Sequence, residues 1–98
     1  MRKGILEYCI LAIISRNEVY ASDILETLKT AEIVVVEGTV YPLLTRMKNE
    51  GLLSYRWQES TGGPPRKYYS LTDDGRTLLN QLSNEWQSIC QAVNQITQ

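Results

Sequence analysis

The chain has 98 residues, of which 43% are hydrophobic and 21% are charged. This length and composition are typical of one soluble domain, and they exclude a disordered or collagen-like chain. The formal net charge is −1, and histidine, the commonest general base and metal ligand, is absent. The two cysteines, Cys9 and Cys90, lie far apart and form no C-x-x-C motif. We therefore expect packed, reduced thiols and neither a metal site nor a cofactor.

The charges are unevenly distributed along the chain. Residues 1–36 hold 4 basic and 5 acidic residues, residues 37–70 hold 5 and 3, and residues 71–98 hold 1 and 3. Only the middle third therefore has a positive balance. A local cationic face on an otherwise acidic chain can still contact phosphate groups, so the net charge does not exclude a nucleic acid as partner.

The first predicted element is a helix over residues 5–14 that is apolar on nearly every side. Leu6 and Ile10 lie on one side of it, and Tyr8 and Leu11 lie on the opposite side. A helix of this kind is covered on both sides. In so short a chain the second cover has to come from another subunit, so we expect Leu11 at a subunit interface.

The same apolar run resembles a signal peptide. Glu7 interrupts the run, however, and residues 15–17 offer no small-residue cleavage site. No run approaches the roughly 20 apolar residues that cross a bilayer. We therefore expect a cytoplasmic protein without a membrane partner.

Two further helices are predicted, a short one from Ser22 or Asp23 to about Thr30 and a longer one over residues 37–50. The apolar face of the longer helix consists of Val40, Leu43, Leu44 and Met47. Its opposite face is small, hydrogen-bonding and basic and consists of Gly38, Thr39, Pro42, Thr45, Arg46 and Asn49, with Tyr41 on the flank. Such a helix, apolar inside and rich in short donors, acceptors and cations outside, is suited to the major groove of DNA.

Pro42 lies in the second turn of this helix, where proline is normally unfavourable. Either the helix begins later, near Tyr41, or its first turn is kinked in a way that serves the groove. Arg46 likewise has two interpretations, because it contacts DNA or pairs with Glu50 one turn further on.

A β-hairpin is predicted after the third helix. Leu53, Tyr55 and Trp57 alternate with polar residues, residues 60–65 form the turn, and residues 66–71 form the return strand. We expect Trp57 to pair with Tyr69 across the strands. The tip and its basic flank consist of Gly62, Gly63, Arg66 and Lys67. A narrow basic hairpin of this kind can lie along DNA phosphates.

The last predicted element is a long helix that Thr72 caps. Its apolar residues recur every three or four positions and consist of Leu82, Trp86, Ile89, Val93 and Ile96. This heptad pattern indicates a helix that packs on a second copy. The order of elements predicts a mainly α fold with a small β-hairpin: a winged helix-turn-helix DNA-binding domain over residues 1–72, followed by a C-terminal dimerisation helix over residues 73–98.

The motifs also carry a family resemblance. Residues 37–44 (EGTVYPLL) resemble the E-G-T-L-Y-P core of the PadR family of transcriptional regulators, and residues 62–75 (GGPPRKYYSLTDDG) resemble its wing and helix entry. The resemblance covers about residues 4–80, and the single long last helix resembles the short branch of the family. One departure is Val36, which stands where the family often has a capping Asn or Ser.

The resemblance implies a cytoplasmic homodimer that represses transcription at a palindromic DNA operator and is released by a small, often aromatic, compound. It carries over DNA contact to Thr39, Tyr41, Pro42, Arg66 and Lys67. Contacts of Thr45, Arg46 and Asn49 follow from the helix-face argument alone.

Trp86 is either a dimer-core filler or a flat platform for an aromatic ligand, with Tyr8 lining the same cavity. The alternative function is a winged-helix protein-interaction or structural module without operator specificity. An enzyme has no support, because the chain has no histidine, no nucleophile-elbow motif and no phosphate loop.

Overall fold

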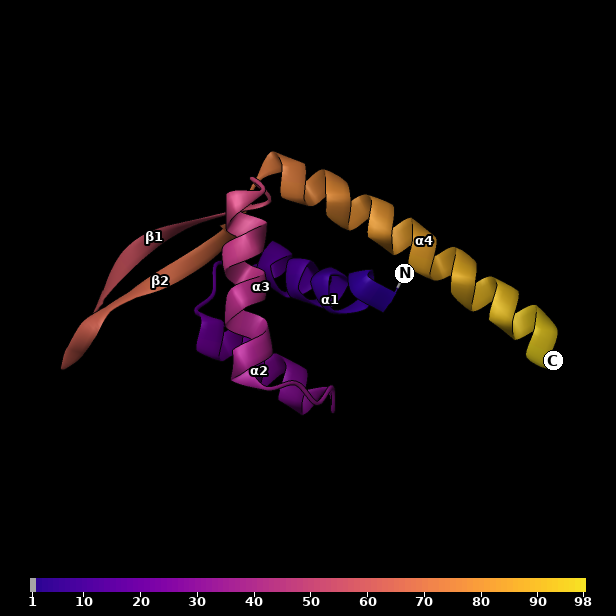
Figure 1. Cartoon of the computed structure of the whole chain (residues 1–98), viewed down its shortest axis with the longest axis horizontal. Helices are drawn as coiled ribbons and strands as arrows, with labels where there is room; N and C mark the ends of the chain where they lie inside the picture. The colour runs from indigo at the N-terminus through magenta and orange to yellow at the C-terminus, as the bar shows by residue number, and fades with distance from the viewer. Residues whose placement is uncertain (1) are drawn as a thin grey trace.

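The structure is a computed structural model that describes residues 2–98, with side chains from residue 4 onward. Its elements are, in chain order, α1 (Arg2–Arg16), α2 (Ala21–Thr30), α3 (Glu37–Asn49), β1 (Leu53–Ser60), β2 (Gly63–Leu71) and α4 (Asp73–Thr97). Figure 1 shows α1, α2 and α3 gathered at the centre, with the hairpin and α4 projecting to opposite sides. The predicted mainly α fold with one antiparallel hairpin is thus confirmed.

One hydrophobic core joins the helices to the base of the hairpin. Its side chains, all at most 8% exposed, are Ile10, Leu11, Ile14, Ile24, Leu28, Val40, Leu44, Met47, Leu53, Tyr69 and Leu82. The expectation that Leu11 lies at a subunit interface is wrong, because this side chain is completely buried within its own chain. The physical reason is that α4, β2 and α2 all pack against α1, so one chain covers both sides of this helix.

The ends of α2 and α3 follow from local hydrogen bonding. α2 begins at Ala21, just before the predicted start, and the Asp23 carboxylate accepts a hydrogen bond of 3.0 Å from the Tyr20 amide. α3 begins at Glu37 and runs through Pro42, so the alternative of a later start near Tyr41 is wrong. Val36 stands at the N-cap of α3 and supplies no side-chain hydrogen bond.

The hairpin pairs differently from the prediction. Tyr55 lies opposite Tyr69, and Trp57 lies opposite Lys67, so the expected pair of Trp57 and Tyr69 is wrong. The strands are longer than predicted, since residues 63–65 belong to β2 and the connection is short. Gly62 has a φ of 77°, a left-handed conformation that favours glycine in a tight turn.

A close backbone approach sets the start of α4. The Thr72 hydroxyl accepts a hydrogen bond of 3.0 Å from the Gly75 amide, which confirms the predicted cap, and donates one of 2.6 Å to the Gly51 carbonyl. A Cβ at Gly75 would lie 2.1 Å from the Leu52 carbonyl oxygen. Only glycine therefore lets α4 begin against the turn that follows α3.

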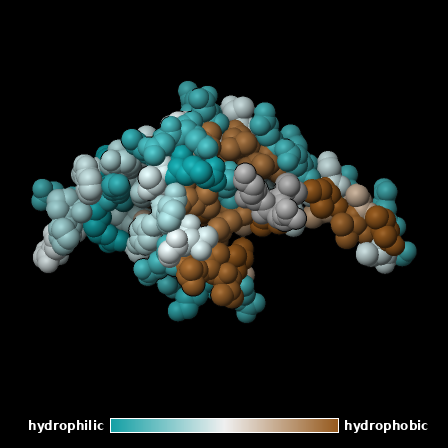
Figure 2. Space-filling view, viewed as in Figure 1, coloured by the Kyte–Doolittle hydropathy of each residue, from teal (hydrophilic) through white to brown (hydrophobic). Residues whose placement is uncertain are grey.

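The apolar stripe of α4 is buried at its start and open beyond it. Leu82 is 8% exposed and packs mainly in the core of its own chain, and its place in a seam between subunits stays a prediction. Further along, Trp86 and Ile89 are each 38% exposed, Val93 is 48% exposed and Ile96 is 82% exposed. The brown atoms along the α4 arm in Figure 2 follow this stripe away from the body of the molecule.

Candidate nucleic-acid interface

The side of α3 that faces away from the core is open along its whole length. Its inner side chains, Val40, Leu44 and Met47, are completely buried. The exposed residues of the helix include all of the predicted groove residues: Gly38, Thr39, Tyr41, Pro42, Thr45, Arg46 and Asn49. The helical periodicity therefore assigned the two faces of α3 correctly.

Arg46 is exposed but is already paired with two carboxylates. Its guanidinium contacts Glu7 of α1 and donates hydrogen bonds of 3.2 Å to both carboxylate oxygens of Glu50. The hydrogen bond to Glu7 is the main cause that raises the pKa of Arg46 above its ordinary value. The pairing with Glu50 is the alternative that the sequence left open, and the link to α1 is new.

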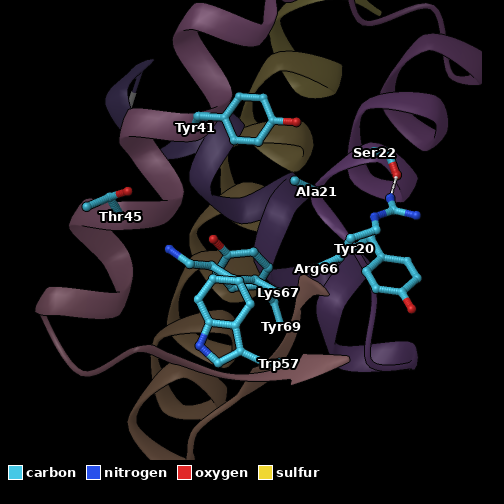
Figure 3. A pocket seen from close by; sticks show the side chains of 9 residues that line it. All are labelled: Tyr20, Ala21, Ser22, Tyr41, Thr45, Trp57, Arg66, Lys67 and Tyr69. Carbon is cyan, nitrogen blue, oxygen red and sulfur yellow. Dashed lines mark hydrogen bonds between the residues drawn. The ribbon is translucent and has the colours of Figure 1, made fainter. Parts of the chain in front are cut away.

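A cleft of about 350 Å³ separates α3 from the wing (Figure 3). The residues that line it come from the N-cap and first turn of α2, from α3 and from both strands: Tyr20, Ala21, Ser22, Tyr41, Thr45, Trp57, Arg66, Lys67 and Tyr69. Figure 3 draws Tyr41 on one side of this space and Trp57 on the other. The cleft thus brings two predicted groove residues of α3 beside the two predicted basic residues of the wing.

The two wing cations rest on aromatic rings. The Arg66 guanidinium lies 3.9 Å from the centre of the Tyr20 ring and donates a hydrogen bond to the Ser22 hydroxyl. The Lys67 ammonium lies 4.7 Å from the centre of the Tyr55 ring and 5.7 Å from that of Trp57. Among the side chains that the structure describes, the ion pairs involve Arg46 and Arg56 and neither wing cation. Both therefore present positive charge that no carboxylate compensates.

Tyr69 is the most buried aromatic residue that lines the cleft. It is 5% exposed, and burial is the main cause that raises the pKa of its phenol above the ordinary value, followed by the nearby Tyr55 and Tyr41. Tyr69 is therefore a neutral phenol near neutral pH, and the cleft keeps its positive character.

The wing tip lies apart from this cleft. Gly62 and Gly63 form the end of the hairpin and do not line the cleft. The structure therefore does not bring these two predicted residues together with the outward face of α3.

The two predicted ligand residues occupy neighbouring helices. Tyr8 is half-buried on α1, and Trp86 lies on α4, which packs on α1. In the described part of the chain, the aromatic rings in contact are Tyr20 with Tyr68, Tyr55 with Trp57, and Tyr55 with Tyr69. The rings of Tyr8 and Trp86 are not in contact with each other.

Sequence reasoning missed the partners of the basic residues. Glu7 pairs with Arg46, and Tyr20 and Ser22 contact Arg66. The period-2 alternation of β2 puts Arg66 and Tyr68 on one side of the strand, and this signal indicates a cation beside aromatic rings. No local signal could have brought Tyr20 or Glu7 to these sites, because Glu7 belongs to α1 and Tyr20 precedes α2, both far from their partners in the chain.

Within residues 2–98, no helix is long and apolar enough to cross a membrane. The same part of the chain contains no group of three or more His, Cys, Asp or Glu residues that could hold a metal ion.

Comparisons with known proteins agree with this geometry. The sequence profile of the transcriptional regulator PadR-like family matches residues 10–81. A PadR-like transcription factor from Bacteroides fragilis is 56% identical, with a TM-score of 0.85 over 98% of this chain and 93% of that chain. A PadR-like transcriptional regulator from Bacillus cereus is 41% identical, with a TM-score of 0.86 over 100% of this chain and 96% of that chain.

Two further relatives are more distant. The structure of Bacillus subtilis PadR in complex with operator DNA is 26% identical, with a TM-score of 0.71 over 79% of this chain and 45% of that chain. An uncharacterised protein from Lysinibacillus sphaericus is 23% identical over 95 residues, which span 94% of this chain and 87% of that protein.

Proposed function

Since this chain belongs to the PadR-like family of transcriptional regulators, we propose that it is a sequence-specific DNA-binding repressor that acts as a cytoplasmic homodimer. One observation carries the proposal: the exposed polar face of α3 and the two uncompensated wing cations, Arg66 and Lys67, border the same cleft. The related Bacillus subtilis PadR was solved with operator DNA.

Gly38 supports the insertion of α3 into a groove. Its φ lies outside the left-handed region, and a Cβ at this position would meet no atom of the chain within 4 Å. Neither the backbone nor the internal packing therefore requires glycine there. Close approach of a DNA backbone to the first turn of α3 does require it, because even a methyl group would hold the phosphates away.

The remaining contacts divide between bases and phosphates. Thr39, Tyr41, Thr45 and Asn49 lie on the exposed face of α3, where hydrogen-bonding groups read base edges, and Pro42 on the same face offers an apolar contact. Arg46 joins them once its carboxylate partners release it. On the wing, Arg66 and Lys67 neutralise phosphates, and the flat tip of Gly62 and Gly63 follows the sugar-phosphate backbone.

The exposed part of α4 supports the proposed homodimer. Trp86, Ile89, Val93 and Ile96 form an apolar stripe that this chain leaves open, and such a stripe marks a protein interface. We therefore assign residues 73–98 to dimerisation and residues 1–72 to DNA binding. A two-fold dimer reads a palindrome whose half-sites lie about one helical turn apart.

Release by a small aromatic compound is a further part of the proposal. The sequence directs attention to Trp86 and Tyr8, because two Trp86 rings near the dimer axis would offer flat apolar faces. The exposed indole of Trp86 supports this location.

Selection of bound duplexes from a random DNA library tests the proposal. We expect an enriched palindromic consensus, and we expect the selected duplex to bind one dimer. If repeated rounds enrich no consensus while the protein remains folded, sequence-specific repression is wrong and a protein-interaction module without operator specificity takes its place.

A further inference from the structure

We infer that Tyr20 is a positioning residue for DNA binding, whose ring holds the Arg66 guanidinium in one orientation before a duplex arrives. Tyr20 acts through Arg66 and does not itself contact the duplex. The inference rests on the proposed function, because it concerns a wing cation that the proposal assigns to a phosphate. It extends the binding machinery to the connection between α1 and α2, which comprises residues 17–20.

A short backbone pairing attaches this connection to the wing. The Val19 amide donates a hydrogen bond of 3.1 Å to the Tyr69 carbonyl, and the Tyr69 amide donates one of 2.8 Å to the Val19 carbonyl. These two bonds form an antiparallel bridge beside β2. Tyr20 follows directly and is the N-cap residue of α2, so its backbone is fixed on both sides. The Tyr20 ring is therefore attached to a well-defined part of the fold.

Four side chains next to this bridge contact each other in a row that has a cation at each end. The Arg66 guanidinium lies 3.9 Å from the centre of the Tyr20 ring, and the centres of the Tyr20 and Tyr68 rings are 4.8 Å apart. The Arg56 guanidinium lies 4.9 Å from the centre of the Tyr68 ring. The negative face of an aromatic ring attracts a cation, so each ring of the row holds one guanidinium.

The two cations of this row differ in their other partners. Arg56 donates hydrogen bonds of 3.2 Å and 3.3 Å to the two carboxylate oxygens of Glu18. The described partners of Arg66 are neutral, namely the Tyr20 ring and the Ser22 hydroxyl, to which Figure 3 draws a dashed line. Arg66 thus has a defined orientation while its charge remains available to a phosphate.

A defined orientation lowers the entropic cost of DNA binding. Arginine loses more rotamer freedom on ordering than most side chains do. A duplex that binds a freely rotating Arg66 has to order it, whereas Tyr20 has ordered it already in this chain. Removal of the ring should therefore weaken DNA binding, although the charge of the protein is unchanged.

Two substitutions of Tyr20 test this effect on a fluorescein-labelled duplex of the selected consensus. Tyr20→Leu should weaken binding about fivefold, since it removes one cation–ring contact. The slope of log affinity against log salt concentration should stay the same, because Arg66 still reaches its phosphate. Tyr20→Phe should bind as tightly as the parent chain, because the ring and not the hydroxyl supports Arg66. Equal losses in the two variants would make the hydroxyl a DNA contact and overturn the inference, as would full binding by Tyr20→Leu.

A double-mutant cycle separates positioning from a general structural role. In an Arg66→Ala background, Tyr20→Leu should change the affinity by less than about twofold, because no guanidinium remains for the ring to hold. Losses that add in the double variant would mean that Tyr20 supports the whole wing, and would overturn the inference. Thermal unfolding checks that each variant is folded.

Arg56→Gln is the matched control, because it removes the other cation of the row and leaves the contact of Arg66 with Tyr20 in place. It should change the affinity by less than about twofold. A loss as large as that of Tyr20→Leu would show that the whole row orients Arg66, and would contradict the role assigned to Tyr20.

An NMR measurement without DNA distinguishes failure of this inference from failure of the proposed function. The Nε proton of Arg66 should resonate upfield of that of a free arginine, because it lies near the face of the Tyr20 ring. Tyr20→Leu should return it to the free value, and Tyr20→Phe should not. If this result is found and no duplex is selected, the proposed function fails while the contact stands. If a duplex is selected and Arg66 of the parent chain resonates at the free value, the inference alone fails.

Discussion

The helices α3 and α4 are both amphipathic, but they differ in what they leave exposed. The apolar stripe of α3 is completely buried within the chain at Val40, Leu44 and Met47. That of α4 is buried only near its start, and Trp86 to Ile96 remain open. Apart from Tyr41 and Pro42, the surface that α3 exposes is mainly polar, whereas the stripe that α4 leaves exposed is apolar.

This difference indicates which kind of partner each helix is suited to bind. A polar, hydrogen-bonding surface is satisfied by water, and base edges and phosphates can replace that water with hydrogen bonds of their own. An open apolar stripe lowers its free energy only by leaving water, and a second protein surface allows it to do so. The following variants test this division of roles, from the largest expected effect to the smallest.

The first pair compares the two faces of α3. Leu44→Ala empties a completely buried position and should lower the free energy of unfolding by about 2–5 kcal/mol. Thr45→Ala, on the exposed face, should change it by less than about 0.5 kcal/mol. Urea denaturation measures both. Similar losses in the two variants would mean that α3 has no functionally distinct outer face.

The second pair compares the two faces of the α4 arm. Ile89→Asp should give a monomer in sedimentation experiments and lower the affinity for a palindromic duplex about a hundredfold, because paired half-sites add avidity. Gln91→Asp adds the same charge on the polar side of the helix and should leave the dimer intact. A dimeric Ile89→Asp variant with full affinity would refute the role of the stripe.

The third pair compares a free cation with a compensated one. Arg66→Ala should weaken DNA binding about tenfold. It should also reduce the slope of log affinity against log salt concentration by about one, the loss expected for one phosphate contact. Arg46→Ala should weaken it less, because Glu7 and Glu50 already compensate the Arg46 charge. Fluorescence anisotropy at several salt concentrations measures both. A larger loss with Arg46→Ala would show that Arg46 contributes more to DNA binding than the wing cation does, and would contradict this order.

The smallest effect is expected at Gly38, where stability and binding should change in opposite directions. Gly38→Ala adds a methyl group in open space and should raise the free energy of unfolding by about 0.5–1 kcal/mol, because alanine favours a helix. DNA affinity should fall, because the methyl group intervenes between α3 and the duplex. Unchanged affinity would remove the evidence for close approach at this residue.

Much of the fold could be predicted because it depends on local periodicity. The faces of α3, the Thr72 cap and the order of helices and strands all follow from residues within one or two turns of each other. The predictions that proved wrong concern longer distances. Leu11 is buried because three elements pack on α1, and Trp57 faces Lys67 because the turn lies at residues 61–62 and the register shifts between Gln58 and Ser60.

The candidate site divides in the same way. The sequence by itself determined which residues of α3 and β2 are polar, basic and outward, since a helix and a strand repeat with known periods. Only the tertiary structure decided that Glu7 pairs with Arg46, that Tyr20 lies beneath Arg66 and that Tyr41 and Trp57 face one cleft. These contacts join residues far apart in the chain, and the packing of the shared core sets their positions. No local pattern encodes that packing, so the sequence shows the chemistry of each face and the structure shows which faces meet.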